Sequence, residues 1–410
     1  MAPRLPMLPT DSSPDQFTPI VARVLHIEDV TRGDPQKDYI VRFRGRLYSE
    51  DSEAAYTQLA DSLRSMEVTP IFRLEEGRHV IILKAGVIRP KPSDIRWNIA
   101  MFVLTVLSVV FTGATNAYDG PANPDFIQVV IYSIVHWWKG LPFAISMMAI
   151  LLAHEFGHYI AGRLHKTAVT LPYYIPLPSP FSPFGTMGAF IQMKEIPKNR
   201  RHLLDIGVAG PLAGLMVAIP VLIIGLATSP VETVKLPEPG YSIQFEGNSL
   251  LYGAVKFAVK GEWLPSAPEG FTGPGFLYHV IHFFTGGPAP FGGHDITLNG
   301  IAWAGWAGLL VTALNLLPVG QLDGGHLMYV LLGKNVAKVR PFVIGLALML
   351  GLVWQGWWLW ALLMWVFGRF YAEPLDLITP LDNRRKILAV LGLVILVLIF
   401  TPVPLSQFFG

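Results

Sequence analysis

The 410-residue sequence contains no cysteine and few charged residues. Without cysteine the chain can form neither disulfides nor thiolate metal sites, so histidine and carboxylate side chains remain as the metal ligands it can offer. Charged residues make up only 15% of the chain, the net charge is +2, and no basic block indicates a nucleic-acid partner. The first twenty residues also lack an apolar run, so no cleavable signal peptide is expected.

The chain is instead rich in long apolar stretches. Hydrophobic residues make up 52% of it and its mean hydropathy is +0.44, far from an ordinary soluble protein. We therefore predict a multi-pass α-helical membrane protein that contacts the lipid bilayer through about seven spans. The expected spans are residues 98–114, 141–160, 203–228, 301–317, 341–353, 357–367 and 387–402.

A polar region precedes the first span. Residues 1–18 carry four prolines and predict a flexible tail, and residues 19–94 predict a small soluble α+β domain. Within that domain, alternating patterns predict strands at 20–27, 39–48, 68–73 and 79–84, with a helix at 52–65. Both a docking role and a sensing role stay open for this domain. Residues 95–410 form the predicted membrane domain.

The loops differ in charge, and this difference predicts their orientation. The loop at 162–202 is mainly basic, whereas the loop at 229–297 has more acids than bases. By the positive-inside rule, the first loop and the N-terminal domain are expected on the cytoplasmic side and the second loop outside. The polar residues His279, His282, His294 and Asp295 of that outer loop are expected at its surface.

The sequence HEFGH at 154–158 places ionisable groups inside the apolar helix expected at 141–160. His154 and His158 are one helical turn apart, so both imidazoles can reach one ion while Glu155 lies beside them. Charge within a membrane is costly and usually functional, although polar residues that merely line a helix interface are the alternative. Zinc takes about four ligands, one of them water in a catalytic site, so a third protein ligand is expected elsewhere.

A second unusual segment, LLPVGQLDGG at 316–325, follows the span expected at 301–317. Its prolines and glycines interrupt the helix at membrane depth, which requires surrounding protein or water. Asp323 of the LDG sequence (322–324) is the acid at that depth, and a carboxylate in such a setting favours a cation. We consider Asp323 as a metal ligand or as the N-cap of the next helix. His326, one turn later, could be a further ligand, but we expect it instead beside the metal ligands or in a helix-capping role.

Together, HEFGH and the later NLLPVGQLDGG resemble the site-2 protease family of intramembrane zinc metalloproteases. The stretch GTMGAFIQMKEIPKNRRHLLDIGVAGPLAG at 185–214 is similar to the branch found in cyanobacteria and plastids, whose members have a soluble N-terminal domain. This resemblance implies a multi-pass protein of the bacterial cytoplasmic membrane or a thylakoid-type membrane, with its N-terminus cytoplasmic.

The resemblance also implies the roles of individual residues. It assigns Zn²⁺ to His154, His158 and Asp323, makes Glu155 the general acid/base, and suggests that Asn315 helps to polarise the scissile carbonyl. Other branches have NPxPxxxLDG where this chain has Asn315-Leu-Leu-Pro.

The implied activity is hydrolysis of a peptide bond in single-span membrane protein substrates, near the cytoplasmic leaflet. Such a substrate must be locally unwound, and residues 185–193 predict either a strand edge that receives it by β-addition or a hairpin that only covers the site. A catalytically silent scaffold or chaperone on the same fold is the alternative function. A transporter would predict inverted repeats, and none is evident. The oligomeric state stays open.

Overall fold

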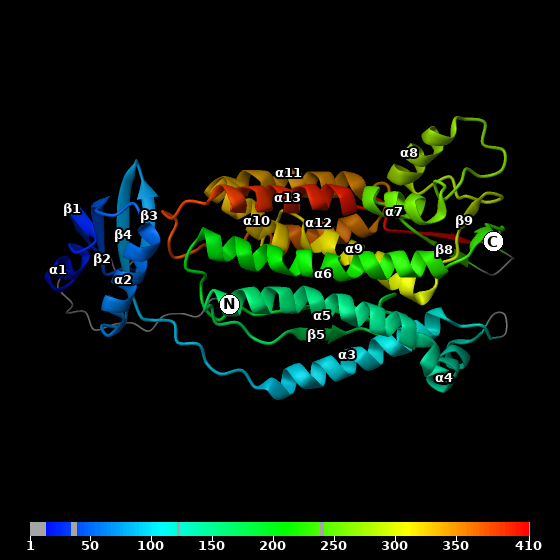
Figure 1. Ribbon diagram of the computed structural model, residues 1–410, viewed down its shortest axis with the longest axis horizontal. Helices are drawn as coiled ribbons and strands as arrows, with labels where there is room; N and C mark the ends of the chain where they lie inside the picture. Colours follow the sequence, from blue (N-terminus) through cyan, green and yellow to red (C-terminus); the bar gives the residue numbers. More distant parts are fainter. Residues whose placement is uncertain (1–13, 34–38, 121–123, 238–241, 410) are drawn as a thin grey trace.

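The computed structural model describes residues 14–33, 39–120, 124–237 and 242–409. The molecule is elongated: a small N-terminal domain lies at one end of a helical bundle, and the loop between α6 and α9 lies at the other (Figure 1). Residues 1–13 of the predicted tail lie outside the described residues.

The N-terminal domain is a four-stranded antiparallel sheet with the strand order β1-β2-β4-β3, covered by one long helix. Its elements are η1 (Pro14–Gln16), α1 (Thr18–Val21), β1 (Leu25–Arg32), β2 (Val41–Leu47), α2 (Ser52–Arg64), β3 (Val68–Glu75) and β4 (Arg78–Ala85). Alternate residues of β2 and β3 are buried, which is the periodicity of strands with one face on a core. One face of α2 packs on that core through residues such as Leu59 and Leu63.

The start of this domain differs from the prediction. The strand expected at 20–27 is wrong in its first half, because Thr18–Val21 form a helical turn and β1 begins at Leu25. Pro19 stands at the start of this turn, where its missing N–H and fixed φ are tolerated. Phe17 and Val21, four residues apart, are both buried in the domain core. Ordered structure therefore begins ahead of residue 19.

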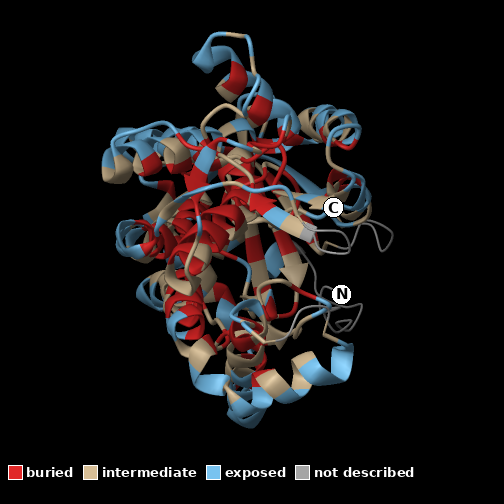
Figure 2. Cartoon of the chain, turned by 90° about the vertical axis from the view of Figure 1, so that its right-hand side faces the viewer, coloured by how far each residue is buried: buried red, intermediate tan, exposed pale blue. Residues whose placement is uncertain are grey.

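The bundle is built around three helices. The buried residues gather in its interior and the exposed ones on its outer faces, as the end-on view in Figure 2 shows. The main core contains residues of α5, α6 and α9. The helices of the bundle are α3 (Ile95–Asn116), α5 (Leu141–Leu164), α6 (Arg200–Thr228), α9 (Gly300–Asn315), α10 (Asp323–Leu332), α11 (Val336–Leu350), α12 (Gly356–Phe367) and α13 (Asn383–Ile399).

Among the described residues, three helical segments are long and apolar enough to cross a membrane. These segments are Ile95–Asn116, Trp137–Leu164 and Arg200–Thr228. Helices also occupy the other four predicted spans, but they contain only 12 to 17 residues. The helical class is therefore confirmed, whereas the count of about seven spans is not.

Short elements connect the helices. Between α3 and α5 lie α4 (Phe126–Val135) and η2 (Trp137–Gly140), and η3 (Gly333–Asn335) separates α10 from α11. A hairpin of β5 (Tyr173–Pro176) and β6 (Thr186–Phe190) lies between α5 and α6. The loop after α6 contains β7 (Val231–Thr233), β8 (Ser242–Glu246), α7 (Leu250–Lys260), α8 (Gly275–Thr285) and β9 (His294–Ile296). Strand β7 pairs with β9, and β8 pairs with the last strand, β10 (Leu405–Phe409).

The N-terminal domain contacts the bundle through hydrogen bonds to the connector that precedes α13. The Phe72 N–H in β3 donates to the Leu375 carbonyl at 2.9 Å, and the Leu377 N–H donates back to Phe72 at 3.1 Å. Leu375 also packs against the domain core. Glu53 at the start of α2 accepts a hydrogen bond from Arg201 at 3.1 Å. The domain is thus docked where α6 begins.

Candidate metal centre

Helix α5 carries the HEFGH sequence two turns before its end. The helix runs through small and apolar residues from Pro142, which occupies the first turn, to Leu164. His154, Glu155 and His158 are all buried, with 4%, 4% and 6% of their surface exposed. The spacing of four residues places both imidazoles on one face of α5, as the sequence predicts.

Asp323 reaches the same place from a broken segment of chain. Helix α9 ends at Asn315, a turn follows, and α10 begins with Asp323. Gly320 has φ +63°, a left-handed conformation that glycine adopts readily, and a Cβ at Gly324 would lie 1.8 Å from the Leu316 carbonyl oxygen. In the described part of the chain, the cap position belongs to Leu322 and no side chain caps α10, so the N-cap alternative for Asp323 is wrong.

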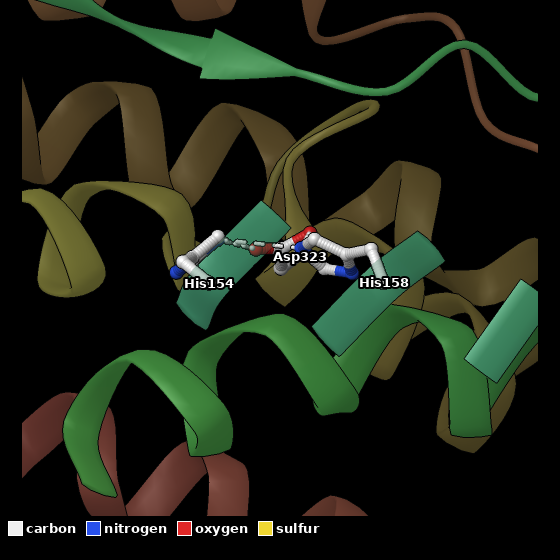
Figure 3. Close-up of side chains that lie close together, drawn as sticks. All are labelled: His154, His158 and Asp323. Carbon is white, nitrogen blue, oxygen red and sulfur yellow. Dashed lines mark hydrogen bonds and ion pairs between the residues drawn. The ribbon is translucent and has the colours of Figure 1, made fainter. Parts of the chain in front are cut away.

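The three side chains converge on one point, and Figure 3 shows them directed toward one another. The Nε2 atoms of His154 and His158 each lie 3.3 Å from an oxygen of Asp323, and the two Nε2 atoms are 3.3 Å apart. Among the described residues, this is the group of histidine and carboxylate atoms close enough to hold a metal ion. The remaining members of the predicted site, Glu155 and Asn315, lie beside it, as described below.

Helix α6 determines which nitrogen of His158 faces the group. The Nδ1 of His158 lies 2.7 Å from the Ile206 carbonyl oxygen. A carbonyl only accepts, so Nδ1 carries the proton and the lone pair of the neutral ring is on Nε2. A buried imidazole with its other nitrogen bound to a carbonyl is the arrangement typical of metal-binding histidines.

Glycines on the same face of α6 make room for the rings. A Cβ at Gly210 would lie 2.0 Å from the His158 Nε2, and one at Gly214 would lie 3.1 Å from the His154 Nδ1. The small residues of GVAGPLAG indicate close helix approach from sequence alone. What the sequence does not reveal is that the side chains they admit are the two imidazoles.

The donor set fits a tetrahedral divalent cation such as Zn²⁺. Ligands bound at about 2.0 Å in tetrahedral geometry are separated by about 3.3 Å, which is the distance between the two Nε2 atoms and from each Nε2 atom to its nearer Asp323 oxygen. Two nitrogens and one carboxylate oxygen suit zinc, and three protein ligands leave a fourth position for water.

A small cavity opens beside this group. It measures about 70 Å³, enough for about two waters, and its lining includes His154, Glu155, Asn315 and residues 187–189 of β6. The Nδ2 of Asn315 lies 3.4 Å from the Nε2 of His154. A carboxyl group, a side-chain amide and a strand therefore border the cavity beside His154.

Three other predictions about histidines and acids have mixed outcomes. His326 is buried, and its Nδ1 lies 2.9 Å from the Leu322 carbonyl, outside the group of donor atoms. His294 is exposed, as expected. The expectation of surface positions is wrong for His282 and Asp295, which are only 8% and 7% exposed. They are buried because the loop between α6 and α9 is packed: Asp295 lies 3.7 Å from the buried Lys256 Nζ, and the His282 ring stacks on Tyr278. The proline- and glycine-rich sequence of the loop did not indicate this packing.

The fold and the site together define a helical bundle with a His-His-Asp metal centre of the kind found in metallopeptidases. The sequence profile described as peptidase family M50 matches residues 142–353. The chain belongs to this family, and the predicted resemblance to site-2 proteases is confirmed.

Named relatives support the same assignment. The chain is 32% identical over 347 residues to the probable zinc metalloprotease EGY1, chloroplastic, of Arabidopsis thaliana, covering 78% of this chain and 56% of that protein. It is 29% identical to EGY1 of Oryza sativa subsp. japonica, covering 62% and 41%, and 26% identical to EGY2 of Arabidopsis thaliana, covering 65% and 42%. The chain thus spans about half the length of these curated relatives. No solved structure matches it.

Proposed function

We propose that this chain is an intramembrane zinc endopeptidase that cleaves membrane-anchored proteins near the cytoplasmic leaflet. The observation that carries this proposal is the convergence of His154, His158 and Asp323: the two buried imidazoles lie 3.3 Å apart at Nε2, and each Nε2 lies 3.3 Å from an oxygen of Asp323. The proposal is supported by membership of a peptidase family and by relatives whose names are "probable zinc metalloprotease".

In this proposal His154, His158 and Asp323 hold the zinc ion. When bound, Zn²⁺ lowers the pKa of a water molecule from 15.7 to about 7 and polarises a peptide carbonyl as a Lewis acid. The Ile206 carbonyl keeps the His158 ring in the tautomer that presents Nε2 to the ion. The two imidazoles are buried and the Asp323 side chain is only 15% exposed, which limits the access of bulk water.

Glu155 acts as the general acid/base. It is next to His154 in the chain and lines the same cavity. Its carboxylate takes a proton from the attacking water while the water oxygen bonds to the carbonyl carbon, and it gives that proton to the amide nitrogen as the C–N bond breaks. The side-chain amide of Asn315, 3.4 Å from the His154 Nε2, donates to the negative charge that develops on the carbonyl oxygen.

Strand β6 is the proposed docking edge for the substrate. It pairs with β5 along one side, and Met187, Gly188 and Ala189 line the cavity beside Glu155. A peptide bond within a transmembrane helix is shielded by its own hydrogen bonds, and extension along a strand edge exposes it. Met187 is 70% exposed and Phe190 is 50% exposed, so apolar side chains are available to contact such a segment.

The proposed topology has seven crossings with a cytoplasmic N-terminal domain. Contacts support the grouping of loops: the connector at 372–380 and the start of α6 both contact the N-terminal domain. Strand β10, in contrast, pairs with β8 of the 229–299 loop, so the two ends of α13 belong to opposite sides. The basic loop at 162–202 assigns the first group to the cytoplasm. We place the protein in a bacterial cytoplasmic membrane or a thylakoid-type membrane; the relatives are named chloroplastic.

The test is cleavage of a single-span substrate by the purified full chain in lipid vesicles. Glu155→Gln is expected to lower the cleavage rate by about 10²–10⁴-fold, the usual contribution of a general acid/base, while zinc content measured by elemental analysis stays at the wild-type level. Glu262→Gln, at an exposed position of the outer loop, serves as the control and is expected to cleave normally. Undiminished cleavage by Glu155→Gln would overturn the mechanism, and a wild-type protein that holds zinc yet cleaves nothing would favour the scaffold alternative.

A further inference from the structure

A cluster of charged side chains lies at the end of α5, next to the metal centre but not part of it. The Nε2 of His165, the C-cap residue that follows α5, lies 2.9 Å from Asp205 Oδ2 on α6. Arg385 of α13 donates to both oxygens of the same carboxylate, with Nε 2.9 Å from Oδ1 and Nη2 2.6 Å from Oδ2. Three helices therefore meet at Asp205.

Asp205 immediately precedes the residue that orients a metal ligand. The next residue, Ile206, supplies the carbonyl that lies 2.7 Å from the His158 Nδ1. His158 and His165 are seven residues apart, close to two helical turns, so both rings leave α5 on the same face. Two imidazoles therefore contact two consecutive residues of α6. His165 contacts the Asp205 side chain, and His158 contacts the Ile206 carbonyl.

These two contacts oppose a sliding of α5 along the axis of α6. A slide of α5 by one residue would move each ring by about 1.5 Å, which is enough to break a 2.7 Å hydrogen bond. At Gly210 and Gly214, α6 offers no side chain that would interlock with α5 and oppose such a slide. The hydrogen bonds at Asp205 and Ile206 add two specific contacts that favour one register.

We propose that Asp205 is a positioning residue for the metal centre, and that His165 and Arg385 act through it. This inference rests on the proposed function, in that it takes His158 as a metal ligand. The contacts of Asp205 fix the position of the second turn of α6, so that the Ile206 carbonyl lies within hydrogen-bond distance of the His158 Nδ1. The hydrogen bond of His165 to Asp205 fixes the position of α5 along α6. The side chains of His165, Asp205 and Arg385 are 20–30% exposed, so their ion pairs add little to overall stability. Their effect is expected on the geometry of the centre.

The test uses the purified full chain and measures metal affinity by competition with a chelator. Asp205→Asn is expected to weaken zinc binding by about 10–100-fold, the range for residues that orient metal ligands from outside. Replacement of zinc by Co²⁺ adds a spectroscopic readout, since the visible absorption of cobalt reports ligand geometry and is expected to change in this variant. In the cleavage assay, kcat is expected to fall while KM is retained.

Asp382→Asn is the matched control. The Asp382 carboxylate also accepts a hydrogen bond from Arg385, at 2.6 Å, and it caps α13. Both of these hydrogen bonds are with Arg385 and neither involves α5 or α6. Asparagine still caps a helix, so this variant removes one carboxylate from the same arginine and is expected to bind zinc and cobalt as the wild type does.

Variants at His165 keep the inference testable if Asp205→Asn fails to fold. His165→Ala is expected to weaken metal binding to a similar degree, and His165→Gln, whose amide can still donate to Asp205, is expected to restore it. Wild-type affinity and an unchanged cobalt spectrum in Asp205→Asn or His165→Ala would overturn the inference. A wild-type protein that binds no metal would instead refute the proposed function.

Discussion

Buried ionisable side chains gather in two regions of this molecule, and the two regions differ in where the positive charge comes from. In the loop between α6 and α9, the chain supplies its own cation: the Lys256 Nζ lies 3.8 Å from Glu246 and 3.7 Å from Asp295, and Lys256 is fully buried. In the bundle, Asp323 faces two imidazoles, and no lysine or arginine among the described residues forms an ion pair with it.

This difference teaches how to distinguish a structural charge cluster from a candidate metal centre. A buried carboxylate requires a positive partner, because charge in a low-dielectric interior is costly. The Lys256 ammonium, 4.6 Å from the centre of the Tyr252 ring, meets that need in the loop. In the bundle the need is left to an ion from solution. The three predictions below test this contrast.

The largest effect is expected from loss of the carboxylate in the bundle. Asp323→Ala leaves two protein ligands, so zinc affinity is expected to fall by more than the roughly 100-fold limit for outer residues, and zinc content measured by elemental analysis should approach zero. Asp295→Asn changes a buried acid in the other region and is expected to leave zinc content unchanged. Equal zinc loss in both variants would end the distinction between the two regions.

Removal of the buried cation in the loop should affect stability and not metal content. Lys256→Met keeps most of the apolar stem but leaves Glu246 and Asp295 without their partner, at an expected cost of about 3–5 kcal/mol. Thermal unfolding in detergent, followed together with zinc content, measures both quantities. Lys260→Met on the same helix removes a lysine that bonds the Ser229 carbonyl at 2.7 Å and is expected to change stability much less. Similar unfolding curves for both variants would contradict the role given to Lys256.

The smallest effect is a dependence of stability on pH. Burial and the nearby Asp295 together raise the pKa of Glu246 to about 7, against the opposing effects of Lys256 and the hydrogen bond from Tyr252. Between the unfolded value of 4.5 and about 7, the folded protein holds a proton that the unfolded chain has released. The contribution of Glu246 to stability therefore falls as pH rises through this window.

Glu246→Gln removes this contribution, so the difference in melting temperature between variant and wild type should change between pH 5 and pH 8. The difference is the quantity to measure, because burial also lowers the pKa of His282 to about 4, which favours the folded state as pH rises. A constant difference across this range would show that Glu246 does not titrate as described.

Much of the bundle follows from local pattern. Apolar runs predict where α3, α5 and α6 lie, and the spacing of His154 and His158 predicts that they share a face. The interrupted segment before Asp323 predicts a turn at depth. These features depend on residues near one another in the chain, so periodicity and turn chemistry are enough to predict them.

Other features depend on partners far away in sequence, and there the local pattern misleads or is silent. The pattern at 20–27 alternates like a strand, but Phe17 and Val21 are turned into the core by a helical turn. His282 and Asp295 lie in a polar loop yet are buried. Nothing in the sequence marks Ile206, since its contribution to the site is a backbone carbonyl, which every residue possesses.

The sequence alone determined which atoms the chain can offer to a metal: with no thiols, two imidazoles on one helical face and one acid in a broken helix stand out through spacing and polarity. The tertiary structure decided their separation of 3.3 Å and the tautomer of His158. Those depend on how α6 packs between the helices that carry the ligands. Close packing at Gly210 and Gly214 depends on two helices in contact, so it cannot be predicted from the sequence of either helix alone.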